Sequence, residues 1–438
     1  MNLPTEYSAE ASNLMRELDA LGGLAAVLDA PFVDTLDIEE NRALGDSELL
    51  RASGLSEFSG LHGIAGEESG VTDTGARGIA RFRELGNLDL RFTRFGDSGL
   101  RQLSHLRQLR VVRLVGTDVS DFGIEGLRGS LDELKELQLD HTGVADDSIS
   151  FLSGAIRLSK LRVRGTEVTD AACGVLESIS SLVLVDLSGT RCSHHAIAQL
   201  RQSRPDLRVV FETIPDLPAI LRNSNIPVVS ASQHVERHGG KIGMRVVAGQ
   251  SVIDSLEWTH QRERRMDQEI EAILQIPEFS TLRSIDLELD FLGDRSCKTI
   301  ARLEQLQSVS LGHSMVSDEG MRELFGLHHL QSLSLMHCWI TDQLLAELVK
   351  ALPNLRSLAL SGTMISDEGV SSLTGHSQLE GLGLWNTKVT DSCLEAIRRL
   401  PRLKELEVPY TYVTNAGADW LRSVRPDLKV MQGRTSAY

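Results

Sequence analysis

The sequence has few aromatic residues, no long apolar segment and no excess of basic residues. Phe, Trp and Tyr make up 4% of its 438 residues. It has no uninterrupted run of about 18 apolar residues, the length that a transmembrane helix requires. Lys and Arg number 45 against 61 Asp and Glu, which gives a net charge of −16. Binding to nucleic acid or to an anionic membrane usually requires a basic surface. We therefore expect neither as a partner.

Cysteine is scarce, and the start of the chain does not resemble a secretory signal. The first residues, MNLPTEYSAEASN, lack a basic segment followed by an apolar core. The cysteines are scattered, odd in number and never arranged as CxxC: Cys173, Cys192, Cys297, Cys338 and Cys393. We expect them to be reduced, structural thiols in a protein of the cytoplasm.

The sequence does contain a repeat of 24 or 25 residues. The residues at one position of five successive copies are Leu88, Val112, Leu137, Leu161 and Val185. One copy, LRVVRLVGTDVSDFGIEGL from Leu109, shows the pattern LxxVxLxxTxVSDxxIxxL. Its LxL part alternates with period 2 and predicts a short strand, whereas the part after Asp has apolar residues three apart and predicts a short helix. Such a unit cannot bury its apolar face alone, but stacked units can. The repeat therefore predicts an α/β solenoid.

Two polar positions recur in the repeat. Ser or Thr followed by Asp, as in Ser120-Asp121, stands where each helix should begin, and side-chain oxygens there can accept the first free N–H groups. A threonine follows each strand and can bond to the backbone at the turn: Thr93, Thr117, Thr142, Thr166 and Thr190. We expect both positions to serve the fold, and we do not interpret the aspartates as catalytic carboxylates.

The whole array is duplicated. Adding 221 to a residue number of the first array gives its equivalent in a second array, so that Val112 corresponds to Leu333 and Thr142 to Thr363. Each array should begin with a capping helix, over residues 8–21 and 229–238, followed by a Gly-Gly pair. We interpret GGKIG, residues 239–243, as a turn after the second cap. We predict a first array at residues 1–212, a linker at 213–227 and a second array at 228–438.

The pattern LxxLxLxxTxVTDxGLxxL, entered through a helix and a Gly-Gly pair, resembles bacterial leucine-rich repeat proteins. Its style is similar to the short cysteine-containing repeats of F-box-type proteins, with Thr in place of Cys. The resemblance covers roughly residues 30–212 and 250–432. It implies a leucine-rich repeat horseshoe that acts in protein–protein interaction, and it carries no catalytic residues. The sequence also lacks HExxH, GxSxG and Walker A motifs. We therefore predict no enzyme activity, no cofactor and no metal site.

The two arrays differ on the face that their strands should present to the inside of the arc. Of fifteen equivalent positions, nine are charged in the first array. In the second array two are charged and ten are Ser, Gly or Ala. Met, Trp and Tyr follow the strands there and would form a rim around this small-residue floor. The predicted partner-binding residues are His313, Met315, Met336, His337, Trp339, Ser361, Met364, Trp385, Asn386, Tyr410 and Tyr412.

Exposed aromatic and Met side chains around a smooth floor are typical of a protein-binding surface. Our main hypothesis is a non-enzymatic scaffold that binds a protein partner through this surface. An alternative is a glycan or small-molecule receptor, in which Trp339 and Trp385 stack on a sugar and Asn386 donates hydrogen bonds. Three further alternatives are packing of the rim onto neighbouring repeats, self-association through the same face, and a charged partner on the first array.

Overall fold

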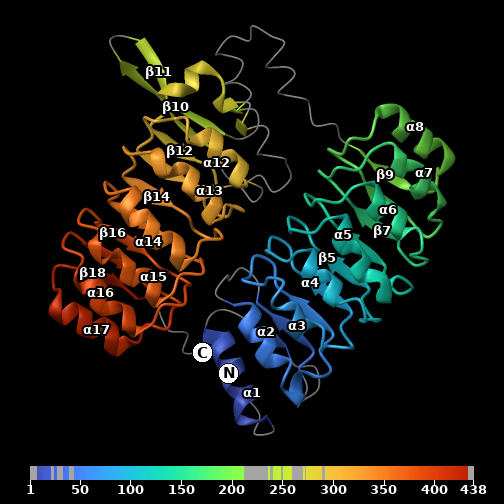
Figure 1. Cartoon of the computed structure of the whole chain (residues 1–438), viewed down its shortest axis with the longest axis horizontal. Coiled ribbons are helices and arrows are strands. Elements are labelled where there is room, and N and C mark those ends of the chain that lie inside the picture. The colour runs from blue at the N-terminus through green and yellow to red at the C-terminus, as the bar shows by residue number, and fades with distance from the viewer. Residues whose placement is uncertain are drawn as a thin grey trace. The chain divides into compact units, whose positions relative to one another are not determined.

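The computed structural model describes residues 7–20, 24–26, 33–38, 44–211, 235–236, 240–247, 250–258, 270–271, 273–288 and 292–432. The chain divides between Ile214 and Pro215 into two units (Figure 1). The predicted linker, residues 213–227, lies outside the described residues, as does most of the predicted cap at 229–238. Within the described part of the chain, no helix has the length and apolar character needed to cross a bilayer.

The first unit is one nine-stranded sheet in which the strands follow chain order. An antiparallel pair, β1 and β2, opens the sheet, and the later strands are parallel. The strands are β1 (Leu24–Ala26), β2 (Thr35–Asp37), β3 (Gly63–Ala65), β4 (Asn87–Asp89), β5 (Val111–Arg113), β6 (Glu136–Gln138), β7 (Lys160–Arg162), β8 (Leu184–Asp186) and β9 (Arg208–Val210). The α-helices are α1 (Ala9–Ala20), α2 (Asp46–Ala52), α3 (Ala76–Ile79), α4 (Asp97–Gln102), α5 (Asp121–Ile124), α6 (Asp146–Leu152), α7 (Ala171–Ser178) and α8 (His194–Ser203).

The second unit repeats this plan with its own nine-stranded sheet. It opens with an antiparallel pair, β10 (Lys241–Val247) and β11 (Gln250–Glu257), which is longer than its counterpart. The parallel strands that follow are β12 (Ser284–Asp286), β13 (Ser308–Ser310), β14 (Ser332–Ser334), β15 (Ser357–Ala359), β16 (Gly381–Gly383), β17 (Glu405–Glu407) and β18 (Lys429–Met431). The α-helices are α12 (Asp294–Ile300), α13 (Asp318–Glu323), α14 (Asp342–Ala351), α15 (Asp367–Ser372), α16 (Leu394–Arg398) and α17 (Asn415–Val424).

The strand register confirms the repeat and its duplication. Val112 pairs with Leu137 in the first sheet, and their equivalents Leu333 and Leu358 pair in the second. The middle residue of each parallel strand packs in a continuous apolar core of its own unit, and it is buried in all of them except β18, where Val430 is half-buried. The flanking residues of each strand point to the other face of the sheet. The predicted α/β solenoid of two arrays is therefore present.

The threonine after each strand bonds as the sequence suggested. The hydroxyl of Thr117 donates to the carbonyl oxygen of Leu114 at 2.7 Å, and that of Thr363 donates to Leu360 at 2.5 Å. Cys338 occupies this position in one repeat, and its Sγ lies 3.0 Å from the carbonyl oxygen of Leu311 in the preceding repeat. All five cysteines are buried and none forms a disulfide.

The aspartate at the start of each helix has a role that the sequence did not reveal. Asp97 accepts hydrogen bonds from the backbone N of Ser120 at 2.7 Å and from its hydroxyl at 2.6 Å. Asp294 makes the same two bonds to Ser317, at the same distances. Ser120 in turn accepts a bond from Phe122 N, as expected for a helix-capping residue. The carboxylate therefore ties each repeat to the next one along the array.

The ends of the arrays are closed by specific elements. Helix α1 confirms the first predicted cap, whereas Lys241–Gly243 lie in β10, so the turn that we expected there is wrong. At the far end, Arg204 donates to the carbonyl oxygens of Glu177, Ile179 and Leu182. Arg425 makes the equivalent bonds to Arg398, Leu400 and Leu403. These bonds explain why both arrays end with the sequence RPDL.

Candidate functional site

In both arrays, a residue with left-handed backbone occurs directly before the threonine position that follows each strand. In the second array these residues have φ between 51° and 68°, and they are His313, His337, Gly362, Asn386 and Tyr410. Gly adopts this conformation freely and Asn adopts it with little strain, whereas other residues pay roughly 1–2 kcal/mol. The second array therefore places His and Tyr side chains where a glycine would be less strained.

Four side chains of the second array form a continuous series of ring contacts, which we name the aromatic row: His313, His337, Trp385 and Tyr410. The rings of His313 and His337 are stacked, with centroids 4.4 Å apart and planes inclined by 16°. His337 meets Trp385 edge to face at 6.2 Å, and Trp385 lies 6.0 Å from Tyr410. The row runs across the ends of β13 to β17. Of these strands, β14 and β16 are labelled in Figure 1.

Gly362 makes the row continuous. A Cβ atom on Gly362 would lie 2.6 Å from Cε1 and Nδ1 of His337, which is closer than van der Waals contact allows. The imidazole of His337 therefore occupies the space over Gly362. It reaches toward Trp385 because this one repeat lacks a side chain at the left-handed position.

The predicted partner-binding residues differ widely in exposure. Tyr410 and Tyr412 are exposed, at 43% and 38%. His313, Met315, Met336, Met364 and Trp385 are half-buried. His337, Trp339, Ser361 and Asn386 are buried.

The expectation that Trp339 is an exposed anchor is wrong. Only 3% of Trp339 is exposed, and its backbone N donates to the carbonyl oxygen of Val316 at 2.9 Å. A parallel bridge also ties Trp339 to Ser317 in the preceding repeat. The exposed part of the predicted surface therefore centres on Tyr410 and Tyr412, with Trp385 half-buried beside them. That these residues bind a partner stays a prediction.

The floor beside the aromatic row consists of small residues, as predicted. Ser332, Ser334 and Ser357 are followed along the sheet by Gly381 and Gly383. A Cβ atom on Gly383 would meet nothing closer than Ser361 Oγ at 3.4 Å, and one on Gly381 would meet only Ser357 Oγ at 3.8 Å. The surface over both glycines is therefore open, and neither glycine has positive φ.

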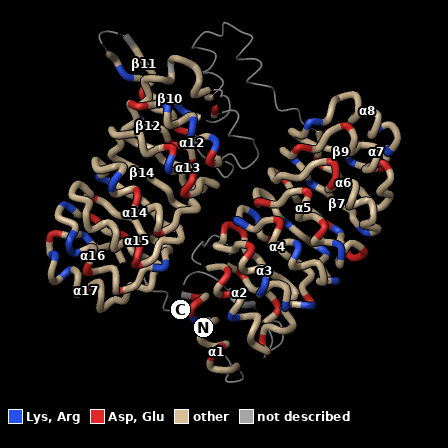
Figure 2. The backbone as a smooth tube through the Cα atoms, viewed as in Figure 1, with Lys and Arg blue, Asp and Glu red and all other residues tan. Residues whose placement is uncertain are grey.

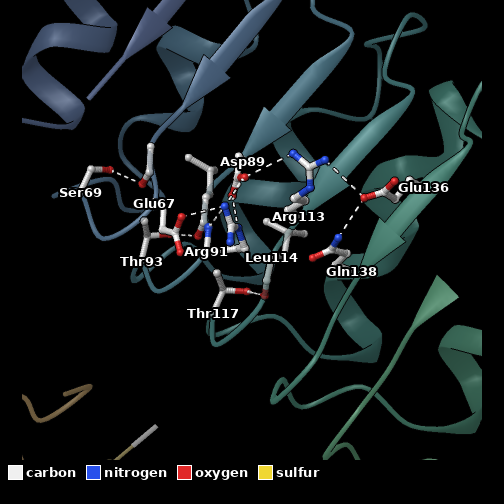
Figure 3. Close-up of polar contacts among 12 residues, drawn as sticks. Glu67, Ser69, Asp89, Arg91, Thr93, Arg113, Leu114, Thr117, Glu136 and Gln138 are labelled. Atoms are coloured by element: carbon white, nitrogen blue, oxygen red, sulfur yellow. Dashed lines mark hydrogen bonds and ion pairs between the residues drawn. The ribbon is translucent and has the colours of Figure 1, made fainter. Parts of the chain in front are cut away.

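The equivalent face of the first array carries a chain of ion pairs (Figure 3). Asp89 accepts from Nε and Nη2 of Arg91, both at 2.8 Å. Arg113 lies between Asp89 at 3.4 Å and Glu136 at 3.3 Å, and Gln138 donates to Glu136 at 2.8 Å. Because these charges are paired with one another, fewer of them remain to attract a partner.

The next strands extend this arrangement to a buried carboxyl group. Asp140 is 2% exposed, accepts a hydrogen bond from Arg164 N at 2.8 Å and lies 2.8 Å from Nε of Arg162. Burial raises the pKa of Asp140 to about 6, and the charges of Arg162 and Arg164 offset only part of that rise. Asp140 is therefore the one carboxyl group with a strongly raised pKa among the described residues of this face. Figure 2 shows charged residues of both signs interspersed along the arrays.

The shared left-handed backbone position is a feature that the sequence did not reveal. The sequence pointed to His313, His337, Asn386 and Tyr410 individually, but not to the one backbone position that they share. A signal was present, because Gly116, Gly165 and Gly189 occupy this position in the first array, always one residue before the threonine.

Residues 276–425 match the model of the leucine-rich repeats of an FBD-associated F-box protein. No curated protein matches the chain in sequence.

Two bacterial solved structures align along most of the chain. An internalin of Listeria monocytogenes is 16% identical, with 97% of this chain and 95% of that chain covered and a TM-score of 0.34. A leucine-rich repeat protein of Leptospira interrogans is 16% identical, with 98% and 100% covered and a TM-score of 0.29.

A plant structure aligns similarly. The ectodomain of the Arabidopsis thaliana receptor kinase HAESA, solved in complex with a peptide hormone, is 14% identical, with 93% and 68% covered and a TM-score of 0.32. The family match over residues 276–425 falls in the second array, and the structure shows the same strand–helix repeat in both arrays.

Proposed function

We propose that the protein is a non-enzymatic scaffold that binds another protein through the concave face of the second array. Leucine-rich repeat solenoids typically bind proteins or peptides on an extended, preformed surface, and they are usually not catalytic. The proposal includes a cytoplasmic location, which is supported by five buried thiols without a disulfide.

The observation that carries the proposal is the aromatic row. The first array has glycine at the positions equivalent to His337, Asn386 and Tyr410, with the same left-handed backbone. The fold therefore does not need these side chains, and His and Tyr add strain where glycine would not. Strained residues that a fold does not require are found most often at functional sites. This argument favours binding over packing for Tyr410, the exposed end of the row, beside which Trp385 is half-buried.

The test is affinity capture from lysate of the source cells with the intact chain and two variants. The double variant Trp385→Ala/Tyr410→Ala removes the exposed end of the row, and both residues lie outside the buried core. Arg164→Ala, at the position equivalent to Trp385, is the matched change in the first array. Circular dichroism must first show that both variants are folded.

We expect the intact chain and Arg164→Ala to capture the same protein, and the double variant to lose it. Capture of that protein by the double variant would refute the proposal. The alternative, a glycan receptor on the same surface, predicts instead that the intact chain captures no protein, and that it binds glycans on an array in a manner that requires Trp385.

A further inference from the structure

We infer that the partner of the second array presents a cationic segment, one Lys or Arg side chain of which lies over Gly383 beside Glu407, Trp385 and Tyr410. This inference rests on the proposed function and specifies the chemistry of the partner. Three observations carry it: an acid without a basic neighbour, the open surface beside that acid, and the aromatic rings next to both.

The concave side of β13 to β17, which the structure describes in full, carries acidic residues but no basic ones. Its charged residues are Glu405 and Glu407, both on β17 and both exposed. Glu405 has a neighbour of opposite sign, since Lys429 Nζ lies 3.3 Å from its carboxylate. Glu407 forms no ion pair with any residue that the structure describes. Its neighbours in the sheet register are Gly383 on one side and Met431 on the other.

The first array places a basic residue of its own beside the equivalent acid. Asp186 is equivalent to Glu407, and its register neighbour on β7 is Arg162. Gly383 is equivalent to Arg162, so the second array keeps the acid but replaces the arginine with the smallest residue. A guanidinium or ammonium group from a partner would place over Gly383, beside Glu407, a positive charge of the kind that Arg162 carries at this position of the first array, where it pairs with Asp140.

The rings beside this position suit the same chemistry. Trp385 lies two residues beyond Gly383 on the same face of the sheet, and its ring centroid is 6.0 Å from that of Tyr410. A cation over an aromatic face is attracted by the ring quadrupole, most strongly by that of tryptophan. A carboxylate next to two such rings favours Lys or Arg over an acidic or neutral side chain, because only a cation gains from both interactions. An anionic ligand would meet no basic group on these strands.

The probe for the test is a displayed library of short random peptides, selected on the intact full-length chain. We expect the selected peptides to contain more Lys and Arg than the unselected library. A selected peptide synthesised with citrulline in place of arginine keeps its shape but loses its charge, and we expect it to bind about tenfold more weakly.

Two substitutions test the position directly. Glu407→Gln removes the charge, and Gly383→Arg places the first array's own arginine over the site, where the surface is open to a side chain. Each should weaken binding of the selected peptides about tenfold. Glu368→Gln removes an exposed charge on helix α15 as the matched control, and it should leave binding unchanged.

The outcomes separate the inference from the proposed function. Selected peptides without an excess of Lys and Arg, or with equal affinity for Glu407→Gln, would overturn the cationic partner, as would the absence of any selected peptide. If such peptides are still lost by Trp385→Ala/Tyr410→Ala, the proposed function stands and only the inference fails. If the double variant binds the peptides as tightly as the intact chain, the surface itself is wrong.

Discussion

On β7 the first array carries Lys160 and Arg162, whereas the equivalent strand β16 of the second array carries Gly381 and Gly383. The residues between them, Leu161 and Leu382, are both buried. The same contrast holds along both sheets, because the buried apolar positions, the strand register and the inter-repeat aspartate bonds are retained while the outward positions diverge. The difference shows that the fold constrains one side of each strand and leaves the other side free to acquire a binding surface.

The largest effect should come from the part that the arrays share. Leu137→Ala and its equivalent Leu358→Ala each remove a core side chain that is no more than 2% exposed. Each should lower the free energy of unfolding of its own array by about 2–5 kcal/mol, since lost burial and a residual cavity both contribute. Similar losses in both arrays would confirm that the core is equivalent.

Urea denaturation can assign each loss to an array. All four tryptophans, Trp258, Trp339, Trp385 and Trp420, lie in the second array. Tryptophan fluorescence therefore reports the second array, while circular dichroism reports both. Leu358→Ala should shift the fluorescence transition and Leu137→Ala should not. A shift of the fluorescence transition by Leu137→Ala would show instead that the arrays unfold as one cooperative unit.

A smaller effect should separate the arrays by pH. The pKa of Asp140 is about 6 in the folded protein, above its usual value of 3.8. The folded state therefore binds the proton more tightly, so stability from this group is present below pH 4 and is lost as the pH rises through 6. The loss at neutral pH amounts to about 3 kcal/mol at most. The second array has Ser361 at the equivalent position and should lack this dependence.

The measurement is the difference in unfolding free energy between the intact chain and Asp140→Asn from pH 4 to pH 7, because other carboxyl groups titrate in both proteins. The variant should gain stability relative to the intact chain as the pH rises. A constant difference across this range would contradict the raised pKa of Asp140. Ser361→Ala, the matched change in the second array, should show no trend.

Sequence patterns predicted those features that depend on local periodicity. The buried LxL residues and the threonine bond follow from spacing within one repeat, and helix α1 follows from the Gly-Gly pair after it; all three are confirmed. The bonds of Asp97 were not predicted, because its partner Ser120 lies 23 residues away and donates partly through its backbone. The burial of Trp339 was missed because it lies in a loop, where no periodicity indicates which way a side chain points.

The candidate site was predictable only in part, for a related reason. The small floor residues lie on strands, so their direction followed from the period of 2. The aromatic row depends on left-handed backbone at His313, His337 and Tyr410, a conformation that few residues other than glycine adopt. The glycines of the first array marked the position, but the side chains of the second array did not.

The smallest effect should come from exchanging the surfaces. Gly381→Lys adds a side chain where a Cβ atom would meet only Ser357 Oγ at 3.8 Å, and Lys160→Ser removes an exposed ion pair in which Nζ lies 3.6 Å from Glu136. Each should change the unfolding free energy by less than about 1 kcal/mol, as exposed pairs and open surface positions usually do. Urea denaturation followed by circular dichroism measures both changes.

A loss of several kcal/mol from Gly381→Lys would mean that the small floor is required for packing of the second sheet. In that case the floor would have a structural cause, and the contrast between the arrays would no longer favour a binding surface. A neutral result would leave recognition as the better explanation for a floor that the fold does not need.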